Sequence, residues 1–305
     1  MTDPGRAADR DEPPFGEVPD LVDRPPSVAD PAAFLDELAD RLTLPVPPQP
    51  GQALRVGLDL GTDSIVLVAL DAEGRPLGLA RREASAVRDG LVVDFEAARS
   101  VTSSLKATLE SRLGVKLRHA AVAVPPGTSE RDSATHRHVA EAAGLETTAV
   151  WNEPEAANLV LGLIDGAVAD LGGGTTGAAI FRRGRLIKSF DEPTGGHHLT
   201  LTLAGRFRLD FEAAESFKLA PENRAVVAAV TAPVLSKMGL ILKAGLAGHV
   251  VKELILAGGC SAAPQAGPIV ARETGLKVRV AHRPDLVTPA GIALGCPAAG
   301  PDEPF

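Results

Sequence analysis

Two short segments nearly duplicate each other, and they constrain the fold more than any other feature of the chain. Residues 56–62 (VGLDLGT) and 168–176 (VADLGGGTT) are each an apolar run that ends in an aspartate, then glycine, then a hydroxyl residue. A second β-type run follows each, at 65–70 and 178–181. Strand, glycine turn and strand predict a hairpin whose backbone N–H groups can bind an anion.

The residue types in these hairpins suit a phosphate ligand. Glycine lets the backbone approach phosphate closely, and the hydroxyls add donors. The aspartates, Asp59 and Asp170, can hold a hydrated Mg²⁺ through its waters. One such hairpin alone could be an ordinary glycine turn. Two of them facing each other would clamp a triphosphate from both sides, so the pair favours a nucleotide site.

Charge and composition narrow the class of partner. The 305 residues carry a net charge of −8 and scattered basic residues, which argues against nucleic acid and anionic membranes as ligands. The chain has no run of 18 apolar residues, and its N-terminus is acidic and proline-rich, so neither a membrane span nor a signal peptide is expected. Cys260 and Cys296 are too few for a disulfide framework, and a cytoplasmic protein is the simple interpretation.

Residues 1–50 are predicted to be a largely disordered leader, because they are rich in proline and charge and poor in large apolar residues. The exception is an amphipathic helix at about 31–43, with Asp30 as its N-cap and an apolar face made by Phe34, Leu35, Leu38 and Leu42. Two interpretations stay open. The helix docks on its own chain, or it detaches to bind a groove of a partner or a shell protein.

From residue 54 onward strands and helices alternate, which predicts an α/β fold of two similar halves around a cleft. Helices are expected near 97–113, 132–143, 154–162, 198–206, 211–218, 224–246, 264–274 and 286–294. The expected divisions are a first lobe at 51–158, a second lobe at 159–284, a helix at 285–296 that returns to the first lobe, and a tail at 297–305.

These segments resemble the actin, Hsp70 and sugar-kinase ATPase superfamily. Five of its landmarks stand in order: two phosphate loops at 59–64 and 170–175, connecting segments at 152–157 and 284–291, and an adenosine motif at 256–261. The resemblance implies a two-lobed fold of duplicated ribonuclease H-like halves with ATP or ADP and Mg²⁺ in the cleft. No Hsp70 peptide-binding domain is expected, and no insert for a sugar site is evident.

Within the superfamily the chain is similar to the EutJ family of ethanolamine utilisation, on the stretches 87–95, 125–128 and 194–205. This resemblance implies a chaperone-like ATP-binding switch, with a slow Mg-dependent ATPase activity, that acts on a protein partner: an enzyme, a reactivating factor or a microcompartment shell component. It places the protein in the cytoplasm, with a bacterial microcompartment as a site of association.

The resemblance also implies roles for individual residues. Asp59 and Asp170 match the Mg²⁺-associated carboxylates, and Glu153 matches the acid that positions the attacking water. Glu155 competes with Glu153, although an acid at a helix start also has a purely structural explanation. The phosphate contacts are expected from Gly61, Thr62, Asp63, Ser64, Gly172, Gly173, Gly174, Thr175, Gly195 and Gly196.

The adenosine end is expected to use Gly258, Gly259, Ser261, Asp285 and an E-x-x-K pair, Glu215 and Lys218. A plain ion pair would explain Glu215 and Lys218 equally, and helix capping would explain Asp285.

Three departures from the superfamily argue for weak turnover. No lysine matches the catalytic lysine of Hsp70 proteins, Gly177 stands where an acid is common, and Asp63 puts a negative charge beside the first phosphate loop.

His197 and His198 are expected to line the cleft or cap a helix rather than bind a metal, because adjacent residues point apart. The competing functions are a bacterial-actin-like assembly protein, a small-molecule kinase and a nucleotide-binding scaffold without turnover.

Overall fold

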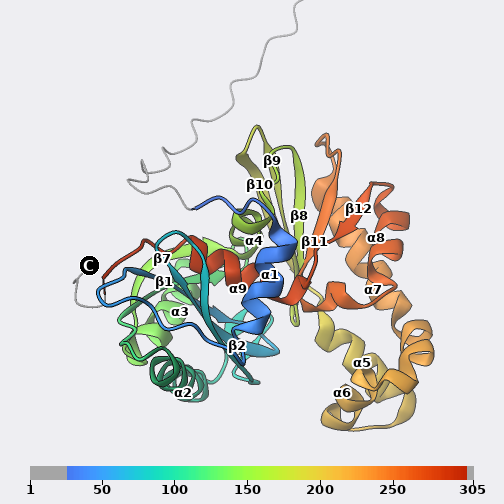
Figure 1. Cartoon of the computed structure of the whole chain (residues 1–305). Coiled ribbons are helices and arrows are strands. Elements are labelled where there is room, and N and C mark those ends of the chain that lie inside the picture. Colours follow the sequence, from blue (N-terminus) through green and yellow to red (C-terminus); the bar gives the residue numbers. More distant parts are fainter. Residues whose placement is uncertain (1–25, 301–305) are drawn as a thin grey trace, which may run out of the picture.

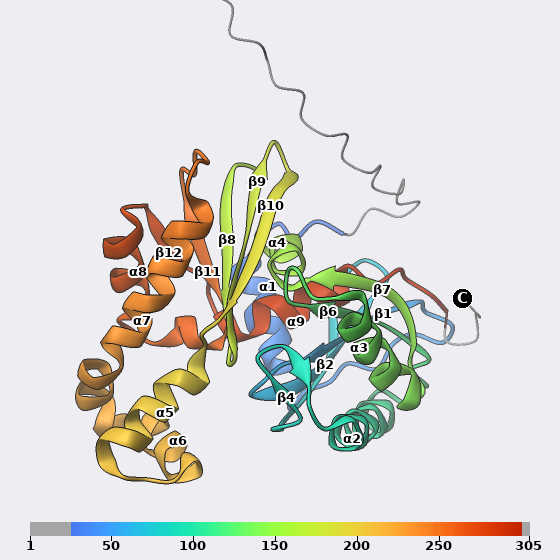
Figure 2. The same ribbon diagram turned by 180° about the vertical axis from the view of Figure 1, so that it is seen from behind.

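A computed structural model describes residues 26–300. Half of the expected leader and the last residues of the expected tail, 1–25 and 301–305, lie outside the described residues. Each glycine turn lies in a hairpin of its own five-stranded sheet, and the two sheets stand on either side of a pair of helices (Figures 1 and 2). The expected α/β fold of two lobes is confirmed.

The two sheets share one strand order. In the first sheet the antiparallel meander β3-β2-β1 continues into the parallel strands β6 and β7, and in the second β10-β9-β8 continues into β11 and β12. The first set is β1 (Leu54–Leu60), β2 (Ser64–Asp71), β3 (Pro76–Glu83), β6 (His119–Val124) and β7 (Glu146–Asn152). The second set is β8 (Gly166–Leu171), β9 (Thr175–Arg182), β10 (Arg185–Pro193), β11 (Leu254–Ala257) and β12 (Val278–Val280).

Two of these strands, β3 and β10, have no counterpart among the elements expected from the sequence. The first five residues of β3 are buried and its last three are exposed, whereas β10 has no buried residue; both are edge strands with several charged residues. The charged end of β3 and all of β10 are held by pairing to their hairpin partners rather than by an apolar face of their own. A short hairpin, β4 (Val87–Arg88) with β5 (Leu91–Val92), precedes the first long helix.

The helices after residue 94 begin and end within two residues of the expected positions. Asp94 caps the first by accepting from the Ala97 N–H, and Gly114, at φ +72°, ends it. The set is α2 (Phe95–Leu113), α3 (Glu130–Ala142), α4 (Glu153–Leu161), α5 (Gly196–Phe207), α6 (Phe211–Leu219), α7 (Arg224–Leu246), α8 (Ala266–Thr274) and α9 (Pro284–Leu294).

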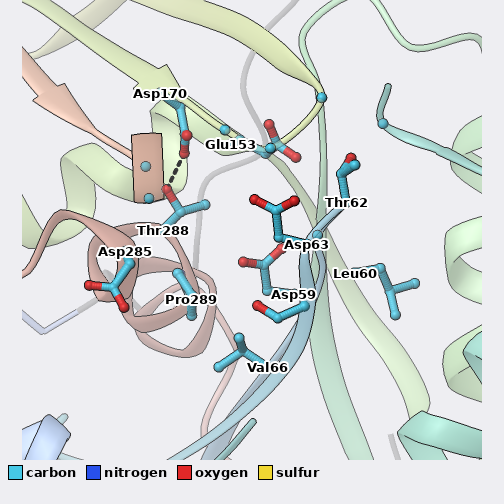
Figure 3. Close-up of a pocket in the computed structure, with 18 of the residues that line it drawn as sticks. Asp59, Leu60, Thr62, Asp63, Val66, Glu153, Asp170, Asp285, Thr288 and Pro289 are labelled. Atoms are coloured by element: carbon cyan, nitrogen blue, oxygen red, sulfur yellow. Dashed lines mark hydrogen bonds between the residues drawn. The ribbon is translucent and has the colours of Figure 1, made fainter. Parts of the chain in front are cut away.

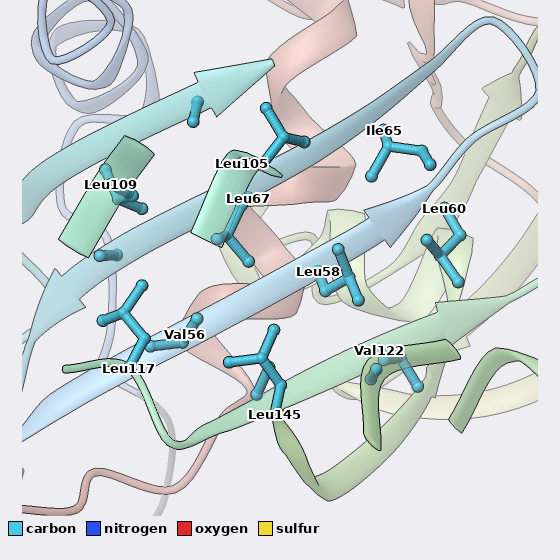
Figure 4. Close-up of a cluster of buried hydrophobic side chains, with 14 of the residues drawn as sticks. Val56, Leu58, Leu60, Ile65, Leu67, Leu105, Leu109, Leu117, Val122 and Leu145 are labelled. Carbon is cyan, nitrogen blue, oxygen red and sulfur yellow. The ribbon is translucent and has the colours of Figure 1, made fainter. Parts of the chain in front are cut away.

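The core is divided by the sheets. Under the outer face of the first sheet, leucines of α2 such as Leu105 and Leu109 pack on Leu58 and Leu67 of the central strands (Figure 4). Between the sheets, α4 and α9 join both lobes in one cluster that contains Val68, Val168 and Ala290. These two helices are the connecting segments, so they hold the lobes around the cleft.

The leader helix α1 (Pro31–Asp40) packs against its own chain. Leu35 and Leu38 are fully buried in the cluster between the sheets, and Asp36 pairs with His282 at 2.8 Å and with Arg283 at 2.6 Å. Hydrogen bonds from these two partners lower the pKa of Asp36. The helix ends earlier than expected, so Leu42 is exposed rather than part of its apolar face.

One helical stretch, Pro221–Leu246, is long and apolar enough by length and composition to cross a membrane, in contrast to the expectation from the sequence. This is weak evidence, because core helices pass the same test. A third of its most apolar window is buried, and α7 packs against α5, α8 and β9.

Candidate functional site

The two glycine turns face each other across a cleft between the lobes (Figure 3). The space between the turns is about 690 Å³, open solvent included. Most residues expected at the nucleotide line it: Asp59, Gly61, Thr62, Asp63, Ser64, Glu153, Asp170, Gly172, Gly173, Gly174, Thr175, Gly258, Gly259 and Asp285.

Strand register explains why the two aspartates are equivalent. Asp59 is the second-last residue of β1 and pairs with Val66, and Asp170 is the second-last residue of β8 and pairs with Gly177. Since both sheets have the same order, each aspartate stands just before its glycine turn. Asp170 also accepts a hydrogen bond from the hydroxyl of Thr288 on α9 (Figure 3).

The carboxylates of the cleft, buried or half-buried, repel one another. Burial, and then the charge of Asp170, raises the pKa of Asp59 to about 7, although Arg81 lowers it. Burial raises the pKa of Asp170, against the Thr288 hydrogen bond. Burial also raises the pKa of Glu153 well above its usual range, with further contributions from Asp170, Asp59 and Asp191. A cation in the cleft would relieve this repulsion.

Glu153 and Glu155 have different surroundings. Glu153 is the first residue of α4 and lines the cleft, whereas Glu155 does not line it and accepts a hydrogen bond from the Asn152 side chain. Both acids lie in the first turn, where the helix dipole favours them. Only Glu153 therefore faces the other carboxylates.

Asp63 points from the first phosphate loop toward the second phosphate loop on the other lobe. Its Oδ1 lies 2.8 Å from Nε2 of His197 at the start of α5, and its carboxyl carbon lies 2.5 Å from where a Cβ on Gly173 would be. Burial raises the pKa of Asp63, but the hydrogen bond and charge of His197, with Lys218 and Arg81, outweigh it and lower the pKa. His198 acts as a cap, because its Nδ1 accepts from the Gly195 N–H.

At the other end of the cleft, Gly258 and Gly259 lie beside the start of α9. Gly258, at φ +84°, touches the Asp170 carboxylate so closely that a side chain there would clash. Asp285 forms a 2.8 Å ion pair with Arg81 of β3, and both line the cleft.

Five expected residues are not among those that line the cleft. Gly195 and Gly196 lie behind the second loop, where the Gly196 N–H donates to the Gly172 carbonyl at 2.9 Å. Glu215 and Lys218 pair at 2.7 Å and both contact the Thr200 hydroxyl. Ser261 is buried, and its hydroxyl donates to the Ala257 carbonyl. The roles of these residues stay predictions.

Three polar or charged residues of the cleft and its margin were not among the expected site residues. Arg81 and Asp191 lie on the unpredicted strands β3 and β10, and Thr288 lies inside α9. Thr288 belongs to the connecting segment at 284–291, whereas no motif marks Arg81 or Asp191. A prediction of the two edge strands and of their pairing register would have been the only signal for Arg81 and Asp191.

The donor set fits a hydrated divalent cation. Carboxylate oxygens are the ligands that Mg²⁺ prefers, and Mg²⁺ keeps several of its waters. Within residues 26–300, no three His, Cys, Asp or Glu side chains come close enough together to grip a metal ion directly. The expectation that Asp59 and Asp170 hold Mg²⁺ through its waters stays a prediction.

Comparisons with known proteins agree with this geometry. The profile of the family described as Hsp70 protein matches residues 94–241. The ethanolamine utilization protein EutJ of Salmonella typhimurium is 39% identical over 241 residues, 79% of this chain and 85% of the relative. The crystal structure of EutJ from Carboxydothermus hydrogenoformans is 41% identical, with a TM-score of 0.79 over 87% of this chain and 97% of that one.

A more distant structure has the same fold. MreB5 of Spiroplasma citri, solved with bound AMPPNP, matches with a TM-score of 0.62 at 17% identity, over 80% of this chain and 95% of that one. The duplicated sheets, the two glycine turns facing one cleft and the similarity to EutJ over most of both chains lead to one conclusion: this chain belongs to the EutJ family of ethanolamine utilization proteins, within the Hsp70 and actin-like ATPase superfamily.

Proposed function

We propose that the protein is a nucleotide-dependent switch that binds Mg-ATP and Mg-ADP between its lobes and hydrolyses ATP slowly to ADP and phosphate. One observation carries the proposal: both glycine turns and the acids Asp59, Glu153 and Asp170 line a single cleft at the ends of the two connecting helices. Acids that raise one another's pKa suit a ligand that brings its own cation.

Each group of cleft residues would have its own role in binding and hydrolysing the nucleotide. The backbone N–H groups of the two glycine turns, with Thr62, Ser64 and Thr175, would hold the phosphates, and Gly258, Gly259 and Asp285 would face the nucleoside. Mg²⁺, when bound, would neutralise charge on the phosphates, with Asp59 and Asp170 holding its waters. Glu153 would accept a hydrogen bond from the attacking water and orient it. Positioning and charge neutralisation supply most of phosphoryl-transfer catalysis.

The connecting helices α4 and α9 would change the angle between the lobes according to whether ATP, ADP or no nucleotide is bound. Glu153 begins α4, and Thr288, bonded to Asp170, lies in α9, so a ligand at these side chains bears on both helices that join the lobes. A change in lobe angle would alter an outer surface that a partner reads. The partner would be a protein of ethanolamine utilisation, either an enzyme, a reactivating factor or a shell component, in the cytoplasm or at a microcompartment.

The test is a calorimetric titration of Mg-ATP and Mg-ADP into the parent protein and Asp170→Asn, followed by phosphate release. Asn keeps the shape and can still accept from Thr288, but it carries no charge to hold Mg²⁺. We expect at least a tenfold loss of affinity, a change of about 1.4 kcal/mol. Glu222→Gln, an exposed acid outside the cleft, is the control and should bind as the parent does.

The outcomes separate the candidate functions. No binding by the parent would refute the proposal. Binding without phosphate release would reduce the protein to a nucleotide-binding scaffold. ATP-dependent light scattering in the same samples would replace the switch with an assembly protein.

A further inference from the structure

The carboxylate of Asp191 on β10 lies over Gly177 of β9. Gly177 is the position at which the related superfamily proteins commonly have an acidic residue. Antiparallel register pairs Asp191 of β10 with Gly177 of β9, and Gly177 in turn pairs with Asp170 of β8. A Cβ placed on Gly177 would lie 2.7 Å from Oδ1 of Asp191. The space that a side chain at 177 would enter is therefore taken by the carboxylate of the neighbouring strand.

This carboxylate is incompletely satisfied. Oδ1 of Asp191 is buried and has no hydrogen-bond partner in the part of the chain that the structure describes. The Thr175 hydroxyl, which lines the cleft, bonds the Asp191 side chain. A buried carboxylate oxygen without a partner is costly unless a cation or a fixed water completes it.

The charges that face Asp191 are all negative. Burial raises the pKa of Asp191 to about 7, against the Thr175 hydrogen bond and with smaller contributions from the carboxylates of Asp170, Glu192 and Asp89. Its own charge reaches Glu153 at the start of α4. The acids Asp170 of β8 and Asp191 of β10 thus raise the pKa of Glu153 of α4, Asp170 also raises that of Asp191, and a divalent cation near them would stabilise all three in their charged forms.

Asp191 itself does not line the cleft, whereas Asp170, Glu153 and Thr175 do. Its influence on a ligand would therefore pass through a water or through Thr175, not through direct contact. Asp191 is therefore placed to orient a water or the Thr175 hydroxyl near a cation, rather than to bind the cation itself.

We propose that Asp191 is a positioning residue of the Mg-nucleotide site, whose carboxylate above Gly177 accepts a hydrogen bond from the hydration water of Mg²⁺. The proposal rests on the proposed function. If the proposal holds, Gly177 is not a sign of weak turnover, because Asp191 on β10 supplies the carboxylate that β9 lacks.

The experiment measures how nucleotide affinity depends on Mg²⁺. ADP affinity is determined by calorimetry over a series of Mg²⁺ concentrations, and again in EDTA, for the parent, Asp191→Asn and Glu222→Gln. We expect Asp191→Asn to raise the Mg²⁺ concentration for half-maximal tightening about tenfold, the loss typical of a residue that orients a metal's ligands. Affinity in EDTA should not change, and Glu222→Gln, at an exposed acid outside the cleft, should match the parent.

A relocation variant separates this role from a structural one. With Asp191 replaced by glycine, a Cβ at position 177 meets nothing nearer than Pro126 at 3.5 Å, so the double variant Gly177→Asp/Asp191→Gly can carry a Cβ on β9 and moves the acid there. It should recover most of the parent's Mg²⁺ dependence, whereas Gly177→Asp alone, which clashes with Asp191, should lose it.

Two results would overturn the proposal. If Asp191→Asn keeps the parent's Mg²⁺ dependence while Asp170→Asn loses the nucleotide, the proposed function stands and the role of Asp191 is wrong. If the relocation variant folds with the parent's melting temperature yet stays as impaired as Asp191→Asn, the carboxylate's position over Gly177 is not what matters. A parent that binds no nucleotide refutes both proposals together.

Discussion

At the scale of the residue, the acids proposed to hold Mg²⁺ in the cleft also destabilise the folded protein when they are charged. Asp59 has a pKa of about 7 in the folded protein and an ordinary value of 3.8, so the folded state holds a proton that the unfolded chain releases. Stability therefore falls as the pH rises from 3.8 to about 7. Without Mg²⁺ or nucleotide, we expect Asp59→Asn to raise the melting temperature by roughly 5 °C at pH 8 and by much less at pH 5.

Differential scanning calorimetry in EDTA at the two pH values measures this. Asp59→Asn should also lose its Mg-dependent nucleotide affinity. The variant would then be more stable than the parent but unable to bind the nucleotide with Mg²⁺. An equal gain at both pH values would show that the charge of Asp59 is not the cause.

At the scale of the element, the two connecting helices cross at a glycine. Gly291 of α9 lies so close to the Ala156 carbonyl of α4 that a side chain would overlap it. We expect Gly291→Ala to push the helices apart and to lower the free energy of unfolding by about 1–3 kcal/mol, the usual cost of overpacking. Because Glu153 and Thr288 lie on these helices, nucleotide affinity should fall as well.

Gly205→Ala in α5 is the matched control, since a Cβ there meets nothing within 4 Å. Alanine favours the helix over glycine, so this variant should be as stable as the parent or slightly more so. Chemical unfolding and calorimetry on both variants give the comparison. A Gly291→Ala protein with normal stability would mean that the helices separate without strain.

At the scale of the whole molecule, the pair of Asp63 and His197 joins the lobes across the cleft. The pair holds the Asp63 carboxylate at the second lobe's turn, against Gly173. We expect His197→Ala to weaken nucleotide binding about fivefold, the effect of about 1 kcal/mol, because an unpaired carboxylate would face the phosphates. Calorimetric titration of Mg-ATP measures the change.

The double variant Asp63→Asn/His197→Ala removes the charge together with its partner. Its affinity should return close to that of the parent, as a double-mutant cycle requires for two groups that act through each other. If the double variant stays as weak as His197→Ala, the histidine acts on the nucleotide by another route.

The sequence alone specified the elements that repeat a local pattern. The hairpins around Gly61 and Gly172 and the helices from α2 to α9 follow from glycine turns, apolar periodicity and caps, all encoded within a few residues. The same local signals placed Asp59 and Asp170 at equivalent positions. The edge strands β3 and β10 were not predicted, because charged residues interrupt the apolar pattern of β3 and no residue of β10 is buried.

Tertiary structure decided which distant residues complete the cleft. Thr288 reaches Asp170 because α9 returns between the sheets, and Arg81 meets Asp285 because β3 lies beside the start of that helix. Asp191 covers Gly177 because the register of β9 and β10 sets them opposite each other. The sequence thus determined the two phosphate-type turns by local backbone chemistry. The charges and hydroxyls around them depend on register and helix packing, which form only when the separate segments fold together.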